Sequence, residues 1–237
     1  MKVRQLVLER VMKTYCVDNE RIDAVNDVSL EVEKGDMLSL IGHSGSGKTT
    51  LLSIIGGIVR PTSGRVLFDG KDVYSLTSDS LSDYRCRKVG FMFQFASLLP
   101  MLSAKENLLL PVIFREGGGR AGVQEERKAA ELLHLVGLRD KINAYPAQLS
   151  GGQQRRVAIA RAFMNDPELI LADEPTGDLD EETEADMMRF FRLMNGEKGI
   201  TFIIVTHAAE LARQAGRRLR MSNGVIESIP HSDILSC

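Results

Sequence analysis

Several features that decide a protein's class are scarce or missing in this chain of 237 residues. Its three cysteines (Cys16, Cys86 and Cys237) are widely spaced and odd in number, which argues against both a disulfide framework and a cysteine-based metal site. The apolar runs are short, and even Leu108–Phe114, which Pro111 interrupts, falls far below the ~18 residues of a membrane-spanning helix. The N-terminal stretch lacks the apolar region of a signal peptide. We therefore expect a soluble globular protein of the cytosol.

An excess of charge of one sign is missing as well. Lysine and arginine total 30 and aspartate and glutamate total 32, so the formal net charge is −2. This balance argues against a broad nucleic-acid-binding surface, although a local one stays possible. Apolar residues make up 43% and charged residues 26%, as in folded globular proteins. A chain of this length can bury a substantial core without cross-links.

Predicted strands alternate with predicted helices through much of the chain, and this pattern is typical of a parallel sheet. The predicted strands lie at residues 36–41, 88–93, 169–172 and 201–205. The predicted helices lie at residues 48–58, 151–165 and 181–195, with a short one that begins at Ala208. Since each strand leads into a helix, we expect an α/β core.

Three regions of the chain depart from this alternation: the N-terminal part, the middle and the C-terminal part. Residues 3–11 and 22–32 alternate apolar and polar side chains, which predicts an antiparallel sheet with one wet face. Helical patterns at 103–114 and 123–136 flank the flexible joint Gly117–Gly119, and an Asn-Gly turn at 223–224 predicts a terminal hairpin. We expect one domain over residues 1–237, with an N-terminal antiparallel β-subdomain and an inserted α-helical subdomain at about residues 96–165.

A glycine-rich loop lies between a predicted strand and a predicted helix. It matches the pattern G-x-x-x-x-G-K-[ST] in full, with Gly42, His43, Ser44, Gly45, Ser46, Gly47, Lys48 and Thr49. Backbone N–H groups of such a loop bind phosphate oxygens, the lysine reaches the β- and γ-phosphates, and the threonine hydroxyl binds Mg²⁺. We include Thr50 among the predicted nucleotide contacts. A glycine turn with a chance lysine is disfavoured, because the whole motif stands in the context it requires.

Two carboxylates follow the apolar run at residues 169–172. A buried strand of an open α/β sheet places an acid at its carboxyl end beside the ligand. Asp173 is therefore predicted to hold Mg²⁺, and Glu174 to polarise a water molecule next to the γ-phosphate. Such acids are common helix or turn caps, so the prediction depends on the glycine-rich loop that accompanies them.

A second anion-binding helix start follows at residues 149–153 (LSGGQ). Ser150 can cap a helix, and the two glycines let the backbone approach an anion that the helix dipole favours. A second phosphate-binding helix start is hard to explain unless two surfaces hold the phosphate. The four residues predicted to contact it are Ser150, Gly151, Gly152 and Gln153.

These motifs together resemble those of the ATP-binding cassette (ABC) ATPases, whose signature sequence is LSGGQ. Gln94 matches the Q-loop glutamine of that family, residues 177–180 (GDLD) match the D-loop, and His207 matches the switch histidine. The resemblance implies that Gln94 joins ATP and Mg²⁺ to a membrane partner and that His207 contacts the γ-phosphate. Tyr15 precedes the loop where the family keeps an aromatic residue that stacks on adenine, with simple packing as the other interpretation.

The resemblance also points to a subgroup. Residues 91–100 (FMFQFASLLP), 106–108 (ENL) and 172–180 are similar to the ATPases of lipoprotein-releasing, macrolide-efflux and division-associated ABC systems. It implies an ATP-hydrolysing enzyme with ATP and Mg²⁺ as cofactors, in which Lys48 joins Glu174 and His207 as a catalytic group. It further implies a head-to-tail dimer that holds each ATP between one subunit's glycine-rich loop and the other's signature residues, with Asp180 crossing the interface.

The expected partners are a second copy of this chain and a membrane permease on a separate polypeptide, which would bring the protein to the inner face of the cell membrane. No nucleic-acid partner is expected. The alternative is a soluble ABC ATPase that acts on nucleic acid or the ribosome. It is disfavoured because the segment between Gln94 and Ser150 is too short for a long coiled coil and the chain holds a single cassette.

Two parts of the sequence each allow two interpretations. The apolar residues 98–102 follow Gln94 closely and either pack within the helical subdomain or form part of a docking groove for a partner helix. Arg155 and Arg156 follow the signature and are expected on a solvated helix face, with contact to a nucleotide or partner as the lesser alternative.

Overall fold

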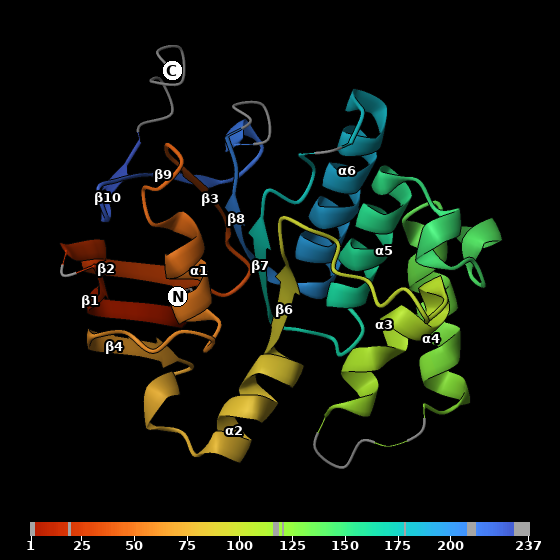
Figure 1. Ribbon diagram of the computed structural model, residues 1–237, viewed down its shortest axis with the longest axis horizontal. Helices are drawn as coiled ribbons and strands as arrows, with labels where there is room; N and C mark the ends of the chain where they lie inside the picture. Colours follow the sequence, from red (N-terminus) through yellow and green to blue (C-terminus); the bar gives the residue numbers. More distant parts are fainter. Residues whose placement is uncertain are drawn as a thin grey trace.

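The computed structural model describes residues 3–18, 20–115, 119, 121–177, 179–207 and 212–229. Two sheets and a group of helices lie side by side in it (Figure 1). The expected helix start at Ala208, Asp178 of the D-loop motif, and Gly117 and Gly118 of the glycine joint fall outside the described residues.

The N-terminal part of the chain forms the predicted antiparallel sheet. Its strands are β1 (Arg4–Val17), β2 (Glu20–Glu33), β4 (Ser63–Phe68) and β5 (Lys71–Asp72), in the order β2-β1-β4-β5. All three pairs of neighbours run antiparallel. β1 and β2 extend beyond the alternating segments that predicted them, because their pairing continues through several register shifts.

A six-stranded sheet forms the centre of the fold. Its strands are β3 (Met37–Ile41), β6 (Val89–Met92), β7 (Leu169–Asp173), β8 (Thr201–Val205), β9 (Arg217–Ser222) and β10 (Val225–Ser228). The order is β10-β9-β3-β8-β7-β6. Neighbours from β9 to β6 are parallel, while β10 returns antiparallel to β9 in the predicted hairpin. The structure confirms the α/β class with its antiparallel subdomain.

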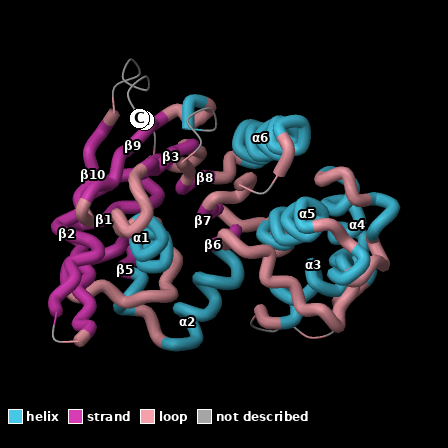
Figure 2. The backbone as a smooth tube through the Cα atoms, turned by 45° about the horizontal axis from the view of Figure 1, so that its top comes forward, coloured by secondary structure: helices cyan, strands magenta, loops and turns pink. Residues whose placement is uncertain are grey.

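Two hydrophobic cores lie on opposite faces of the central sheet, because successive side chains of a strand point in opposite directions. In β7, Ile170 and Ala172 face one core, while Leu169 and Leu171 face the other. The first core is closed by α3 (Ala104–Ile113), α4 (Val123–Leu135), α5 (Gly151–Ala162) and α6 (Glu181–Lys198). The second is closed by α1 (Lys48–Ile55) and the antiparallel sheet, so α1 lies on one side of the strands and α3–α6 lie on the other (Figure 2).

Short elements complete the described residues. α2 (Ser78–Asp83) and the π-helical turn Tyr84–Lys88 were not predicted, since neither is long enough to show a helical pattern of apolar residues. Short 3-10 turns lie at Val73–Ser75, Arg139–Lys141 and Pro146–Gln148. The boundaries expected for a helical subdomain, about residues 96–165, stay a prediction. No helix in the described part of the chain is both long and apolar enough to span a bilayer.

Candidate functional site

Parallel strand ends gather the predicted site residues at one edge of the central sheet. The strands β3, β8, β7 and β6 are neighbours, so their carboxyl ends meet there. The glycine-rich loop follows β3, Gln94 follows β6, and Asp173 ends β7 with Glu174 directly after it. His207 follows β8. This edge is where open α/β sheets bind their ligands.

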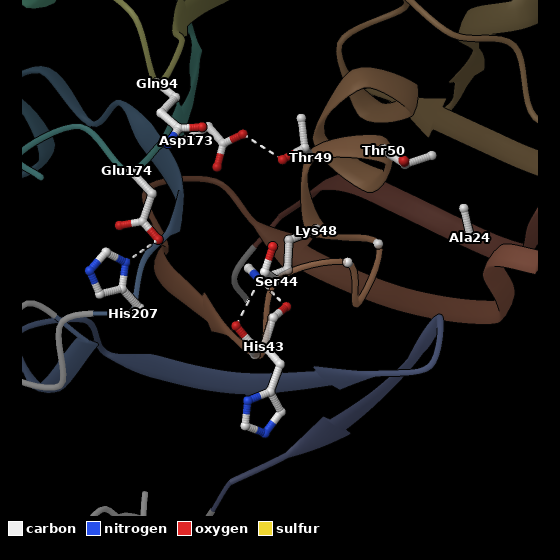
Figure 3. Close-up of a pocket in the computed structure, with 13 residues that line it drawn as sticks. Ala24, His43, Ser44, Lys48, Thr49, Thr50, Gln94, Asp173, Glu174 and His207 are labelled. Atoms are coloured by element: carbon white, nitrogen blue, oxygen red, sulfur yellow. Dashed lines mark hydrogen bonds and ion pairs between the residues drawn. The ribbon is translucent and has the colours of Figure 1, made fainter.

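A cavity of about 560 Å³ opens at this edge, and Figure 3 shows the side chains that surround it. Its lining consists of Ala24, Gly42, His43, Ser44, Gly45, Gly47, Lys48, Thr49, Thr50, Gln94, Asp173, Glu174 and His207. The volume suits a small-molecule ligand. Sequence analysis predicted every lining residue except Ala24, which belongs to β2 and carries no functional group that a motif could reveal.

The glycine-rich loop keeps its shape through a close backbone contact. Gly47 has a φ of 104°, and a Cβ atom there would lie 2.0 Å from the carbonyl oxygen of Ala24. It is also the N-cap of α1, and no side chain caps that helix. The first turn of α1 therefore presents backbone N–H groups to the cavity, where the helix dipole favours an anion.

Lys48 lies across this loop. Its Nζ donates to the carbonyl oxygens of Gly42 at 2.7 Å and His43 at 2.8 Å. Burial lowers the pKa of the Lys48 amine, and the nearby carboxylates of Glu174 and Asp173 offset only part of this shift. The amine is thus positioned as a cation at the point where the loop would hold phosphate oxygens.

Oxygen donors suited to a hard cation lie on the other side of the loop. The Thr49 hydroxyl donates to Oδ2 of Asp173 at 2.6 Å (Figure 3), and Gln94 lines the same cavity. Among the described residues, no group of three His, Cys, Asp or Glu side chains forms a metal site. These donors fit Mg²⁺, which is commonly held by one or two carboxylates together with substrate phosphates.

Glu174 and His207 face each other across the cavity mouth. The imidazole Nδ1 of His207 lies 2.8 Å from Oε1 of Glu174. The Glu174 side chain is 16% exposed, whereas that of His207 is 77% exposed. A half-enclosed carboxylate beside a phosphate site is placed to orient a water molecule.

Arg155 is a residue whose position sequence analysis misjudged. The expected solvated face is wrong for Arg155, which is only 4% exposed and donates to the carbonyl oxygens of Phe93 and Glu174. Arg156 is half-buried and donates to the carbonyl oxygen of Val136. One signal was available, since Arg155 lies one helical turn before the buried Ile159 and so belongs to the apolar face of α5.

Two residues predicted to contact the nucleotide do not line the cavity. Ser46 is buried within the loop and lies 3.4 Å from Lys48 Nζ. Tyr15 lies near the end of β1 with its side chain exposed, and Lys13 Nζ is 5.0 Å from the centre of its ring. The stacking of adenine on Tyr15 stays a prediction.

The signature residues also lie outside the cavity. Ser150 caps α5, since its Oγ accepts from the Gln153 backbone N–H at 3.2 Å while Gln153 Oε1 accepts from the Ser150 N–H at 3.0 Å. Asp180 caps α6 and accepts from both the backbone and the hydroxyl of Thr183, which lowers the pKa of its carboxyl. The predicted roles of these residues toward a second copy stay predictions.

The apolar segment at residues 98–102 packs partly against the core, as one of the two interpretations predicted. Leu98 packs against the core that α3–α6 enclose, and the buried Asn107 accepts from the Leu99 N–H and donates to the Leu102 carbonyl. Leu99 and Met101 nevertheless point outward, with 43% and 71% of their surface exposed. The segment is therefore anchored to the core on one side and exposes apolar side chains on the other; a docking role for these side chains stays a prediction.

Comparison with known proteins gives a consistent result. The family described as "ABC transporter" matches residues 25–177. The macrolide export ATP-binding/permease protein MacB of Syntrophobacter fumaroxidans is 46% identical over 93% of this chain and 31% of its own length. An uncharacterised ABC transporter ATP-binding protein of Thermotoga maritima is 45% identical over 99% of this chain and 97% of its own. The lipoprotein-releasing system ATP-binding protein LolD of Syntrophus aciditrophicus is 42% identical over 92% of this chain and 97% of its own length.

A solved structure agrees with these relatives. It is a dimer of the ATP-binding cassette MJ0796 of Methanocaldococcus jannaschii in a post-hydrolysis state with ADP and Pi. This structure has a TM-score of 0.89 and 41% identity, and it covers 95% of this chain and 99% of its own. This chain spans about a third of the length of MacB but almost all of the Thermotoga, LolD and MJ0796 chains.

Proposed function

Because this chain belongs to the ABC transporter family, we propose that it binds and hydrolyses ATP to drive a membrane-embedded partner. The observation that carries the proposal is the cavity at the edge of the central sheet. It brings Lys48, at the start of α1, together with Asp173 and Glu174 at the end of β7, two segments that lie far apart in the chain. A phosphate-binding loop beside two carboxylates suits hydrolysis of a nucleoside triphosphate better than simple storage of a nucleotide.

Each group in the cavity has a role in the proposed reaction. The loop N–H groups and Lys48 bind the β- and γ-phosphates, and Glu174 accepts a proton from the attacking water. His207 orients the Glu174 carboxylate through the contact at 2.8 Å and meets the γ-phosphate. When bound, Mg²⁺ neutralises charge on the phosphates; Thr49, Asp173 and Gln94 are the residues that would hold it.

The signature residues support a dimer as the active form. Ser150 and Gly151 are exposed at the start of α5, outside the cavity of their own chain. A helix N-terminus of this kind completes an anion site when a second copy brings it to the γ-phosphate. The related cassette MJ0796 is dimeric in its solved structure with ADP and Pi, which supports the same arrangement here.

An exposed apolar surface beside Gln94 supports a membrane partner. Phe93, Phe95 and Met101 are 47%, 76% and 71% exposed, and Phe114 is 74% exposed. Phe93 and Phe114 also border a second cavity of about 310 Å³. Exposed apolar side chains, two of which border a hollow, favour a docking site for another protein. The proposed partner is a membrane permease on a separate chain, which would hold this subunit at the inner face of a membrane; the MacB relative is named as both ATP-binding protein and permease.

Replacement of Lys48 tests the proposed activity. Lys48→Ala should abolish hydrolysis and weaken ATP binding at least tenfold, since a hydrogen bond to a charged group contributes roughly 1.5–3 kcal/mol. Turnover is measured as phosphate release with ATP and Mg²⁺, and affinity with a fluorescent nucleotide. Lys71→Ala on β5 is the control, because Lys71 is exposed and does not line the cavity. Turnover by Lys48→Ala near that of the unchanged protein would refute the proposal.

A further inference from the structure

The buried guanidinium of Arg155 connects two strand ends at the proposed site. Its Nη1 donates to the carbonyl oxygen of Phe93 at 2.6 Å, and its Nη2 donates to that of Glu174 at 3.0 Å. Phe93 follows β6 and Glu174 follows β7, so one planar group spans the carboxyl ends of neighbouring strands. The planar guanidinium donates from two nitrogen atoms whose separation is fixed, whereas a lysine amine would have to reach both oxygens from a single nitrogen atom.

The backbone of Glu174 depends on such support. Glu174 has a φ of 47°, a left-handed conformation that residues other than glycine persist in only when their surroundings enforce it. Its N–H donates to the Val205 carbonyl oxygen of β8 at 2.9 Å, and its own carbonyl oxygen accepts from Arg155. The two contacts hold the peptide groups on either side of the Glu174 Cα, and this fixes the direction in which its side chain leaves the backbone toward His207.

The same arginine reaches the segment that carries Gln94. Arg155 donates to the carbonyl oxygen of Phe93, and Phe93 directly precedes Gln94. Arg161 of the same helix donates to the carbonyl oxygens of Ala96 and Ser97. Helix α5 therefore holds residues 93–97 at several points through its arginines, and through Arg155 it also holds Glu174.

We propose that Arg155 is a positioning residue for hydrolysis, which fixes the carboxylate of Glu174 relative to the segment that carries Gln94. This inference rests on the proposed function. A displacement of residues 93–97 by a partner reaches Glu174 through the guanidinium, because one rigid group contacts both backbones. Arg155 touches neither phosphate nor water in this role, so its loss changes turnover and leaves nucleotide binding intact.

Two variants test the proposal through kcat and KM. Arg155→Lys keeps the charge but replaces two donor nitrogens at a fixed separation with a single one, and Arg155→Gln removes the charge as well. Each should lower kcat by about tenfold to a hundredfold, the range for a misplaced catalytic group. The KM for ATP and the affinity for ADP should change by less than about twofold. The control is Arg218→Lys on β9, a buried arginine outside the cavity lining, which should leave kcat unchanged.

A double-mutant cycle separates positioning from a general effect on folding. In the Glu174→Gln background, Arg155→Lys should change the residual single-turnover rate by less than about twofold, because the group that it positions is already lost. An equal fall in both backgrounds, or a weaker affinity for ADP, would overturn the inference. Suppose that the unchanged protein hydrolyses ATP and that Glu174→Gln does not. A kcat of Arg155→Lys equal to that of the unchanged protein would then refute the role of Arg155 but not the proposed function. An unchanged protein without turnover refutes the proposed function instead.

Discussion

The two predicted phosphate-binding segments use glycine for different reasons. In the glycine-rich loop, Gly47 has a φ of 104°, and an added Cβ would lie 2.0 Å from the Ala24 carbonyl oxygen. At the start of α5, Gly151 has ordinary helical geometry, and an added Cβ would meet no atom of the described residues within 4 Å. The chain's own packing therefore requires Gly47, whereas it does not require Gly151.

This difference supports the proposal that the signature residues make their contact outside their own chain. Glycine weakens a helix relative to alanine, so an exposed glycine at a helix start has a cost in stability without a benefit inside the monomer. A second copy that brings ATP against this backbone supplies that benefit, since a Cβ would keep the phosphate away. The loop half of the site is complete within one chain, while the signature half is not.

The largest expected effect comes from the complete half of the site. Glu174→Gln keeps the shape of the side chain but removes the base, so hydrolysis should fall by about 10²–10⁴-fold. ATP binding should survive, because Lys48 and the loop are unchanged. The variant should therefore dimerise with ATP and stay monomeric with ADP, as measured by size-exclusion chromatography with light scattering. A variant with normal turnover would exclude Glu174 as the base.

The next effect tests the incomplete half. Ser150→Arg in the Glu174→Gln background should weaken the ATP-dependent dimer by more than about thirtyfold, the size of an interface hot spot of about 2 kcal/mol. The control is Thr77→Arg, which also removes an exposed helix cap, that of α2, but lies outside the signature. A dimer that survives Ser150→Arg would have to form through another surface.

The smallest effect sharpens the comparison between the glycines. Gly151→Ala should raise the free energy of unfolding of the monomer by about 0.4–1 kcal/mol, because alanine fits helical geometry and has less freedom when unfolded. The same change should weaken the ATP-dependent dimer. The matched variant Gly47→Ala should instead destabilise the monomer by about 1–3 kcal/mol, the usual cost of a strained backbone. Thermal unfolding measures the stability of both variants. A destabilised Gly151→Ala monomer would contradict the comparison between the two glycines.

Most of the fold could be predicted because its elements carry long local patterns. Strands such as β7 and β8 appear as uninterrupted apolar runs, and the glycine-rich loop stands between a strand and a helix as its motif requires. The short α2 and the turn after it were missed, since a helix of two turns or fewer shows too few apolar positions to reveal a period.

The sequence alone determined the chemistry of this protein, and the tertiary structure decided how its groups meet. The caps of α5 and α6 depend on neighbours within three residues, and the phosphate loop has a contiguous sequence motif, so all three could be recognised directly. The bridge by Arg155 joins residues that are 62 and 19 positions away, and no local pattern encodes such a contact. Burial of that arginine depends on the packing of α5 against the ends of β6 and β7, which only the folded chain brings together.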